Sequence, residues 1–157
     1  RYHIGIIPTH RSSSSLNYLP LFGEQMHLYC GRKHPFYIEL GDIPREEICE
    51  AKYAGLSFHS PTVDKSMSLG LNKMAVANDQ EGIATLISSG CYLGFLPDHY
   101  AESFVKKGQM RAIEPNNFAY HCEFAAIYRK SPKPTRLVEL FLEALAKEHG
   151  KEETMAI

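Results

Sequence analysis

The sequence predicts an α/β fold built around a mostly parallel sheet, and two observations lead to that prediction. Between residues 51 and 114, short apolar runs alternate with helical patterns in the order strand, helix, strand, helix, strand, helix. The helical patterns also carry residues that favour the start or the end of a helix. Successive β-α-β units form parallel sheets with right-handed crossovers, so we expect one sheet with helices on its faces.

The first strand and helix of this block are marked most clearly. The run Tyr53 to Phe58 predicts a strand. Ser60 is a good N-cap, and Pro61 suits the first turn because its missing N–H needs no partner there. We expect this helix to end near Gly70.

The second and third units follow the same plan. Lys73 to Ala77 predicts a strand, and Asn78 is predicted to cap the next helix because Glu81 completes a capping-box spacing. This helix has an apolar face at Ile83, Leu86 and Ile87 and is expected to end at Gly90. The run Tyr92 to Leu96 predicts the third strand, and Pro97 and Asp98 open a helix that is expected to end at Gly108.

This topology predicts a binding edge. The three helices begin after the carboxyl ends of parallel strands, so their free N–H groups should gather around Ser60, Asn78 and Asp98. Open α/β sheets bind ligands at that edge, and helix N-termini favour anions. We therefore expect a small ligand that carries a carboxylate, sulfate or similar group. Helix capping alone would also explain Ser60 and Asn78, and both roles can hold together.

The flanking segments have a different character. Two extended runs, 19–31 and 121–130, could lie side by side, and a third begins at Tyr2, which leads us to expect a chain cut from a longer protein. The acidic stretch 46–50 is expected to be a solvated helical face. Residues 135–146 predict an amphipathic helix, and the apolar face is expected to hold Leu137, Val138, Phe141, Ala144 and Leu145.

Composition narrows the function classes. The 157 residues are 44% apolar and carry a formal charge of −1, so this segment has a core but no basic field for nucleic acid. No apolar run approaches the roughly 18 residues of a membrane span. The four cysteines lack a C-x-x-C pair, which favours reduced thiols, mostly in strands, in a cytoplasmic protein; a redox-sensing pair stays open.

No cofactor, metal or catalytic residue is predicted. The sequence lacks the phosphate-binding, dinucleotide-binding and nucleophile-elbow motifs, and its eight histidines show no H-E-x-x-H or H-x-x-x-H spacing. His34 and His99 are expected at the surface. His59 is the exception to note, because it stands beside the predicted anion site and can titrate near neutral pH.

Several strings, in this order, resemble the effector-binding domain of LysR-type transcriptional regulators. The resemblance covers almost the whole chain, although His3 stands where the family usually has Asp, and Tyr92 where a glycine is common. The matching strings are His3-Ile4-Gly5-Ile6-Ile7, Leu19-Pro20-Leu21-Phe22 with Leu28-Tyr29-Cys30, His34-Pro35-Phe36, Gly90-Cys91-Tyr92-Leu93-Gly94-Phe95-Leu96-Pro97 and Phe124-Ala125-Ala126-Ile127-Tyr128-Arg129-Lys130.

The resemblance implies a periplasmic-binding-protein-like fold with two lobes that close around a small effector. It divides the chain into the end of lobe one (1–18), a crossover strand (19–36), lobe two (37–120), a return strand with the C-terminal helix (121–149) and a frayed tail (150–157). The winged helix-turn-helix that contacts DNA and the beginning of lobe one are expected to be absent from this chain. We also expect a homodimer or higher oligomer, because incomplete lobe one would expose apolar surface.

The resemblance also implies the effector site. The matched positions are two loops, after the first strand and in lobe two, with two neighbouring strand ends: Pro8, Thr9, His59, Ser60, Pro61, Thr62, Asn78 and Pro97. Three other functions stay open at this point: a periplasmic-type solute-binding protein, a catalytic α/β fragment and a protein–protein module.

Overall fold

The computed structural model describes residues 3–9, 12–58 and 60–150. The chain divides into two compact units. Unit 1 comprises residues 1–24 and 122–157, and unit 2 comprises residues 25–121. Strands β2 (Leu16–Gly31) and β7 (Ala119–Arg129) each begin in one unit and end in the other. Among the described residues, no helix is long and apolar enough to cross a membrane.

Unit 2 is the predicted β-α-β block. Its strands are ordered β2-β5-β3-β4, and β6 pairs with β2. Strand β3 is parallel to both β4 and β5, whereas β2 is antiparallel to β5 and β6, so the sheet is mixed. The elements not yet given are η1 (Pro35–Tyr37), α1 (Arg45–Glu50), β3 (Lys52–Leu56), α2 (Pro61–Leu69), β4 (Asn72–Ala77), α3 (Gln80–Ser88), β5 (Leu93–Pro97), α4 (Asp98–Lys106) and β6 (Met110–Ala112).

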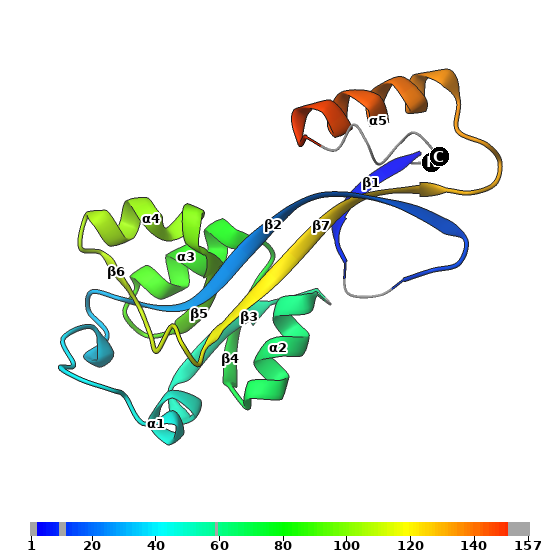
Figure 1. The fold of residues 1–157 in the computed structure, drawn as a ribbon. Coiled ribbons are helices and arrows are strands. Elements are labelled where there is room, and N and C mark those ends of the chain that lie inside the picture. Colours follow the sequence, from blue (N-terminus) through cyan, green and yellow to red (C-terminus); the bar gives the residue numbers. More distant parts are fainter. Residues whose placement is uncertain (1–2, 10–11, 59, 151–157) are drawn as a thin grey trace. The chain divides into compact units, whose positions relative to one another are not determined.

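Helices cover both faces of the unit 2 sheet. Helices α3 and α4 lie on one side and α2 on the other (Figure 1). The side of α3 and α4 holds an apolar cluster that includes Tyr29, Ala54, Ile87 and Leu96. Gly94 makes this packing possible, because a Cβ atom there would lie 2.9 Å from Cδ1 of Ile87. The opposite orientation of neighbouring strand residues places Tyr53 on the side of α2.

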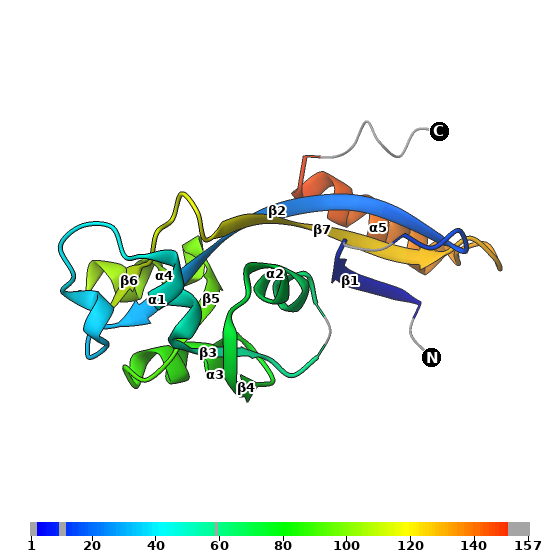
Figure 2. The same ribbon diagram turned by 90° about the horizontal axis from the view of Figure 1, so that it is seen from below.

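Unit 1 is a small sheet with one helix. The strands are ordered β1-β7-β2, and β1 (Ile4–Pro8) pairs antiparallel with β7 from Ile4 opposite Tyr128 to Pro8 opposite Phe124 (Figure 2). The two long extended runs, 19–31 and 121–130, were predicted to lie side by side, and the pairing of β2 with β7 confirms this. Helix α5 (Arg136–Glu148) packs on this sheet, and its cluster includes Leu19, Leu21 and Ala126.

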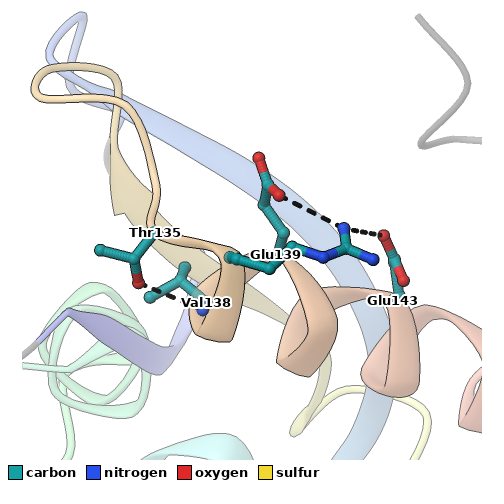
Figure 3. A network of polar contacts seen from close by, with 5 residues as sticks. Thr135, Val138, Glu139 and Glu143 are labelled. Carbon is teal, nitrogen blue, oxygen red and sulfur yellow. Dashed lines mark hydrogen bonds and ion pairs between the residues drawn. The ribbon is translucent and has the colours of Figure 1, made fainter.

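Helix α5 exists as predicted, and the prediction of its buried face was right for Val138 and Leu145 but wrong for Leu137 and Phe141. Its N-cap is Thr135, whose side chain accepts a hydrogen bond from the Val138 N–H (Figure 3). The buried residues are Val138, Leu142 and Ala146, whereas Leu137 and Phe141 are 77% and 49% exposed. The helix is apolar on more than one side, so its sequence pattern alone did not select the side that meets the sheet.

A polar ridge runs along α5 beside these residues. Arg136 Nη1 lies 3.4 Å from an oxygen of Glu139 and 3.5 Å from an oxygen of Glu143, as Figure 3 shows. All three side chains are about half exposed or more, so these ion pairs contribute little to stability.

Local signals correctly predicted several helix ends. Ser60 caps α2, Pro61 occupies its first turn, and Gly70 and Gly90 adopt the left-handed φ values of 77° and 79° that glycine favours. The acidic stretch forms the short helix α1, whose Glu46 and other carboxylates lie on the surface as expected.

One predicted cap was wrong by one residue. The N-cap of α3 is Asp79 and not Asn78: Asp79 Oδ1 accepts the Gly82 N–H at 2.8 Å. Asn78 is instead the acceptor for the hydroxyl of Ser57, at 2.7 Å. Both residue types cap helices well, and the bond from Ser57 decides which of the two neighbours is left to cap.

Candidate functional site

Unit 2 has a topological switch point at the carboxyl ends of β3 and β5. These strands are neighbours and parallel, but the helices that follow them, α2 and α4, lie on opposite faces of the sheet. The chain therefore leaves the two strands towards opposite faces. Such a switch point is where open α/β sheets bind ligands. The predicted residues Ser60, Pro61, Thr62 and Pro97 stand where the chain leaves these strands.

The first turn of α2 carries the polar groups of the site. Ser60 Oγ accepts a hydrogen bond from the Val63 N–H at 3.3 Å, and the Ser60 carbonyl accepts one from the Asp64 N–H at 3.2 Å. Ser60 and Thr62 are only 4% and 8% exposed, so both hydroxyls lie in a desolvated setting. Pro61 fixes the backbone of this turn. His59 lies outside the described residues.

A group of hydroxyl and aromatic side chains lies beneath α2. Thr62 Oγ1 is hydrogen-bonded to the Tyr120 hydroxyl, and one turn later Ser66 shares a hydrogen bond with Tyr53. The ring of Phe95 stands edge-on to both Tyr53 and Tyr120, with centroids 6.1 and 5.3 Å away. Burial raises the pKa of Tyr53 to about 12, so its phenol is neutral at ordinary pH.

Tyr120 was missed at the sequence level. It stands 58 residues from Thr62 and just ahead of the run that was predicted as a return strand. No local pattern singles it out, because its role depends on how β7 enters the sheet of unit 2.

The starts of α3 and α4 differ from that of α2. Asp79 and Glu81 lie in the cap and first turn of α3, and Asp98 lies in the first turn of α4, where its Oδ1 accepts the His99 N–H at 2.7 Å. A carboxylate at a helix N-terminus already neutralises the positive end of the dipole and repels a second anion. The first turn of α2 also holds a carboxylate, Asp64, so the three helices differ in their caps and not in their first turns: the cap is Ser60 in α2, Asp79 in α3 and Pro97 in α4. Helix α2 suits an anionic ligand best because its cap is a hydroxyl and a second hydroxyl, that of Thr62, is buried beside it.

Asn78 and Pro97, the two remaining predicted site residues of unit 2, have different surroundings. The bond from Ser57 to Asn78 ties the loop after β3 to the loop after β4. Pro97 is the buried last residue of β5 and pairs with Met26 on β2, so it can offer only shape to a ligand.

The two predicted residues of unit 1 are held together at the end of β1. Both the N–H and the hydroxyl of Thr9 donate to the Glu123 carbonyl, at 2.8 and 3.2 Å. An open groove of about 550 Å³ lies against Thr9. Its lining residues are Thr9, Ser12, Tyr18, Pro20, Glu123, Phe124 and Ala125. Pro8 and Thr9 belong to unit 1 and the other predicted site residues to unit 2, so each set is described by itself.

The prediction of a surface His34 was wrong. His34 is buried, its Nδ1 accepts the Phe36 N–H at 3.1 Å, and burial lowers its pKa. It serves as the cap of the short helix η1. His99 is exposed, as expected. In the part of the chain that the structure describes, no three histidine, cysteine or acidic side chains are grouped as a metal site.

The cysteines do not form a reactive pair. All four lie among the described residues and are free thiols. Two of them, Cys30 and Cys122, lie in strands, so the expectation that most would do so was only half right. Burial raises the pKa of both these thiols to about 11, which makes them poor nucleophiles.

Comparison with known proteins gives a consistent result. The family described as LysR substrate binding domain matches residues 1–150. The chain is 37% identical over 145 residues to the HTH-type transcriptional activator BauR of Pseudomonas aeruginosa; the match covers 92% of this chain and 48% of the relative. The chain thus spans about half the length of the curated relative it matches.

Solved regulatory domains share the fold. The regulatory domain of CcmR from Synechocystis PCC6803, in complex with 2-PG, has a TM-score of 0.76 at 16% identity, covering 94% of this chain and 73% of that one. The bromide-bound regulatory domain of HypT from Salmonella typhimurium has a TM-score of 0.71 at 11% identity, covering 94% and 72%. The regulatory domain of CrgA from Neisseria meningitidis has a TM-score of 0.70 at 18% identity, covering 94% and 76%.

Proposed function

The chain belongs to the LysR substrate-binding domain family, and from that premise we propose that it is the effector-sensing part of a DNA-binding transcriptional regulator. The curated relative, an HTH-type transcriptional activator, supports this role. We propose that a winged helix-turn-helix of the longer regulator contacts the DNA, since the formal charge of −1 gives this segment no basic field for nucleic acid. A regulator of this kind acts without catalysis, in the cytoplasm where the DNA lies, and as a homodimer or higher oligomer.

The effector we propose is a small anion bound at the start of α2. The observation that supports this proposal is the pair of buried hydroxyls at the start of α2, the Ser60 cap and Thr62. Helix α3 is capped by the carboxylate of Asp79 and α4 begins after Pro97, while the first turn of each of the three helices holds one acidic residue. The positive end of the α2 helix dipole favours negative charge there. Two structural relatives, the HypT domain with bromide and the CcmR domain with 2-PG, support a small ligand of this class.

An effector acts by binding one arrangement of the protein more tightly than another. Pro61, Asn78 and Pro97 would shape the site from the same sheet edge, while Pro8 and Thr9 of unit 1 and the undescribed His59 stay predicted contacts from the family resemblance.

A thermal-shift screen of the chain against sulfate, phosphate, small carboxylates and amino acids tests this proposal. An anion at a hundred times its Kd stabilises the folded state by about 2.7 kcal/mol, which raises the Tm visibly. We expect Thr62→Val and Ser60→Ala to reduce that shift. Asn72→Ala, at the opposite end of β4, is the control and should leave the shift unchanged. The absence of any anion-specific shift in the unchanged protein would contradict the proposal.

A further inference from the structure

We propose that Tyr120 positions the hydroxyl of Thr62 as a donor to the bound anion and thereby links the occupied site to strand β7. The inference rests on the proposed function, because it needs an anion at the start of α2. Its starting observation is the hydrogen bond between Thr62 Oγ1 and the Tyr120 hydroxyl.

The surroundings hold this pair in place. Thr62 is buried in the first turn of α2, and Phe95 on β5 packs edge-on against the Tyr120 ring with centroids 5.3 Å apart. The Phe95 ring also contacts the Tyr53 ring edge-on. A phenol fixed in this way has little freedom to turn its hydroxyl away from Thr62.

The chemistry of a hydroxyl gives the direction of the bond. The hydroxyl of Thr62 has one proton and two acceptor lone pairs. An unprotonated oxygen of an anion can only accept, so it takes the proton of Thr62, and Thr62 must then accept from Tyr120. The result is a relay in which Tyr120 donates to Thr62 and Thr62 donates to the anion. Hydrogen bonds in such a chain polarise and strengthen one another.

The position of Tyr120 in the chain extends the effect beyond the site. It is the second residue of β7, and two residues later the chain enters unit 1, where β7 pairs with β1. An anion that fixes the donor direction of Tyr120 therefore also fixes the first residues of β7.

A double-mutant cycle on sulfate or phosphate binding tests the relay, with Kd measured by calorimetry on the 157-residue chain. Tyr120→Phe should weaken binding about fivefold, as expected for the loss of one hydrogen bond. In a Thr62→Val background the same substitution should have no further effect, because Tyr120 acts only through Thr62. Tyr53→Phe is the matched control: it removes a phenol hydroxyl that contacts α2 at Ser66, and the Kd should stay unchanged.

Three results would overturn the inference in different ways. Binding that is weakened by Thr62→Val but not by Tyr120→Phe would refute the relay and leave the proposed function intact. Equal weakening by Tyr53→Phe and Tyr120→Phe would show general loosening of α2. Absence of anion binding in the unchanged chain would refute both proposals.

Hydrogen exchange on the unchanged chain provides a second test that needs no variant to fold. With saturating sulfate, amides at the start of α2 and at residues 119–122 of β7 should gain protection together. Protection confined to α2 would refute the link to β7.

Discussion

Helices α2 and α3 have the same length of nine residues, and each follows a parallel strand of one sheet, yet they bury opposite kinds of side chain. The buried residues of α3 are Ile83, Ala84 and Ile87, which pack into an apolar cluster. Those of α2 are Thr62, Ser66 and Leu69. Helix α3 therefore packs through apolar side chains, whereas two of the three buried side chains of α2 carry hydroxyls, and that of Thr62 is hydrogen-bonded to Tyr120.

This difference has a functional consequence. A ligand rich in lone pairs can exchange hydrogen bonds with hydroxyls, but it offers nothing to an apolar interface. The helix that is attached through hydroxyls is therefore the one whose contacts a polar effector can alter. In unit 2, α3 supports the sheet and α2 is suited to respond.

The largest expected effect contrasts the two interfaces directly. Ile87 is fully buried, so Ile87→Ala should lower the free energy of unfolding by about 2–5 kcal/mol through lost burial and a cavity. Ser66→Ala should cost only about 1 kcal/mol, the net value of a typical hydrogen bond. Urea unfolding followed by circular dichroism measures both. Equal losses would mean that α2 and α3 are attached in the same way.

The next effect tests the ends of the helices. Asp79→Ala should lower the free energy of unfolding by about 0.5–2 kcal/mol, because it removes the side chain that caps α3. Asn78→Ala, one residue earlier, removes an exposed bond to Ser57 and should cost less. The pair is a matched comparison in the same denaturation experiment. A larger loss for Asn78→Ala would restore Asn78 as the cap.

The sequence predicted what depends on neighbouring residues. The order of strands and helices in unit 2, the cap at Ser60 and the stop at Gly90 all follow from short-range backbone and side-chain preferences. The choice between Asn78 and Asp79 does not, because both can cap and a bond from another loop decides between them. The prediction of the buried face of α5 was partly wrong for a similar reason, because only the sheet that it packs on selects among its apolar sides.

The candidate site was predictable to the same limited extent. Ser60, Pro61 and Thr62 stand at a helix start that local rules identify, and the sheet topology then gives the edge. Tyr120 and the group beneath α2 are joined only by the folded sheet, across 58 residues of chain. The preference for α2 over α3 also required the structure, since it depends on the carboxylate of Asp79, and not the amide of Asn78, being the cap of α3.

The smallest expected effect is a change in how the free energy of unfolding depends on pH. Tyr53 faces α2 and has a pKa near 12, against an ordinary value of 10.0, because burial disfavours the phenolate. The unfolded chain therefore loses this proton first, and stability falls as pH rises from about 10 towards 12. Tyr53→Phe should reduce the slope of unfolding free energy against pH in that window.

Part of the slope should persist in this variant, because the pKa values of Tyr29, on the side of α3, and of the Cys30 and Cys122 thiols are raised as well. Tyr29→Phe is thus the comparison: it should reduce the slope to a similar degree without altering anion binding at α2. An unchanged slope in Tyr53→Phe would mean that water reaches the phenol in the folded protein. The buried hydroxyl interface described for α2 would then be open to solvent, and its contrast with α3 would lose its physical basis.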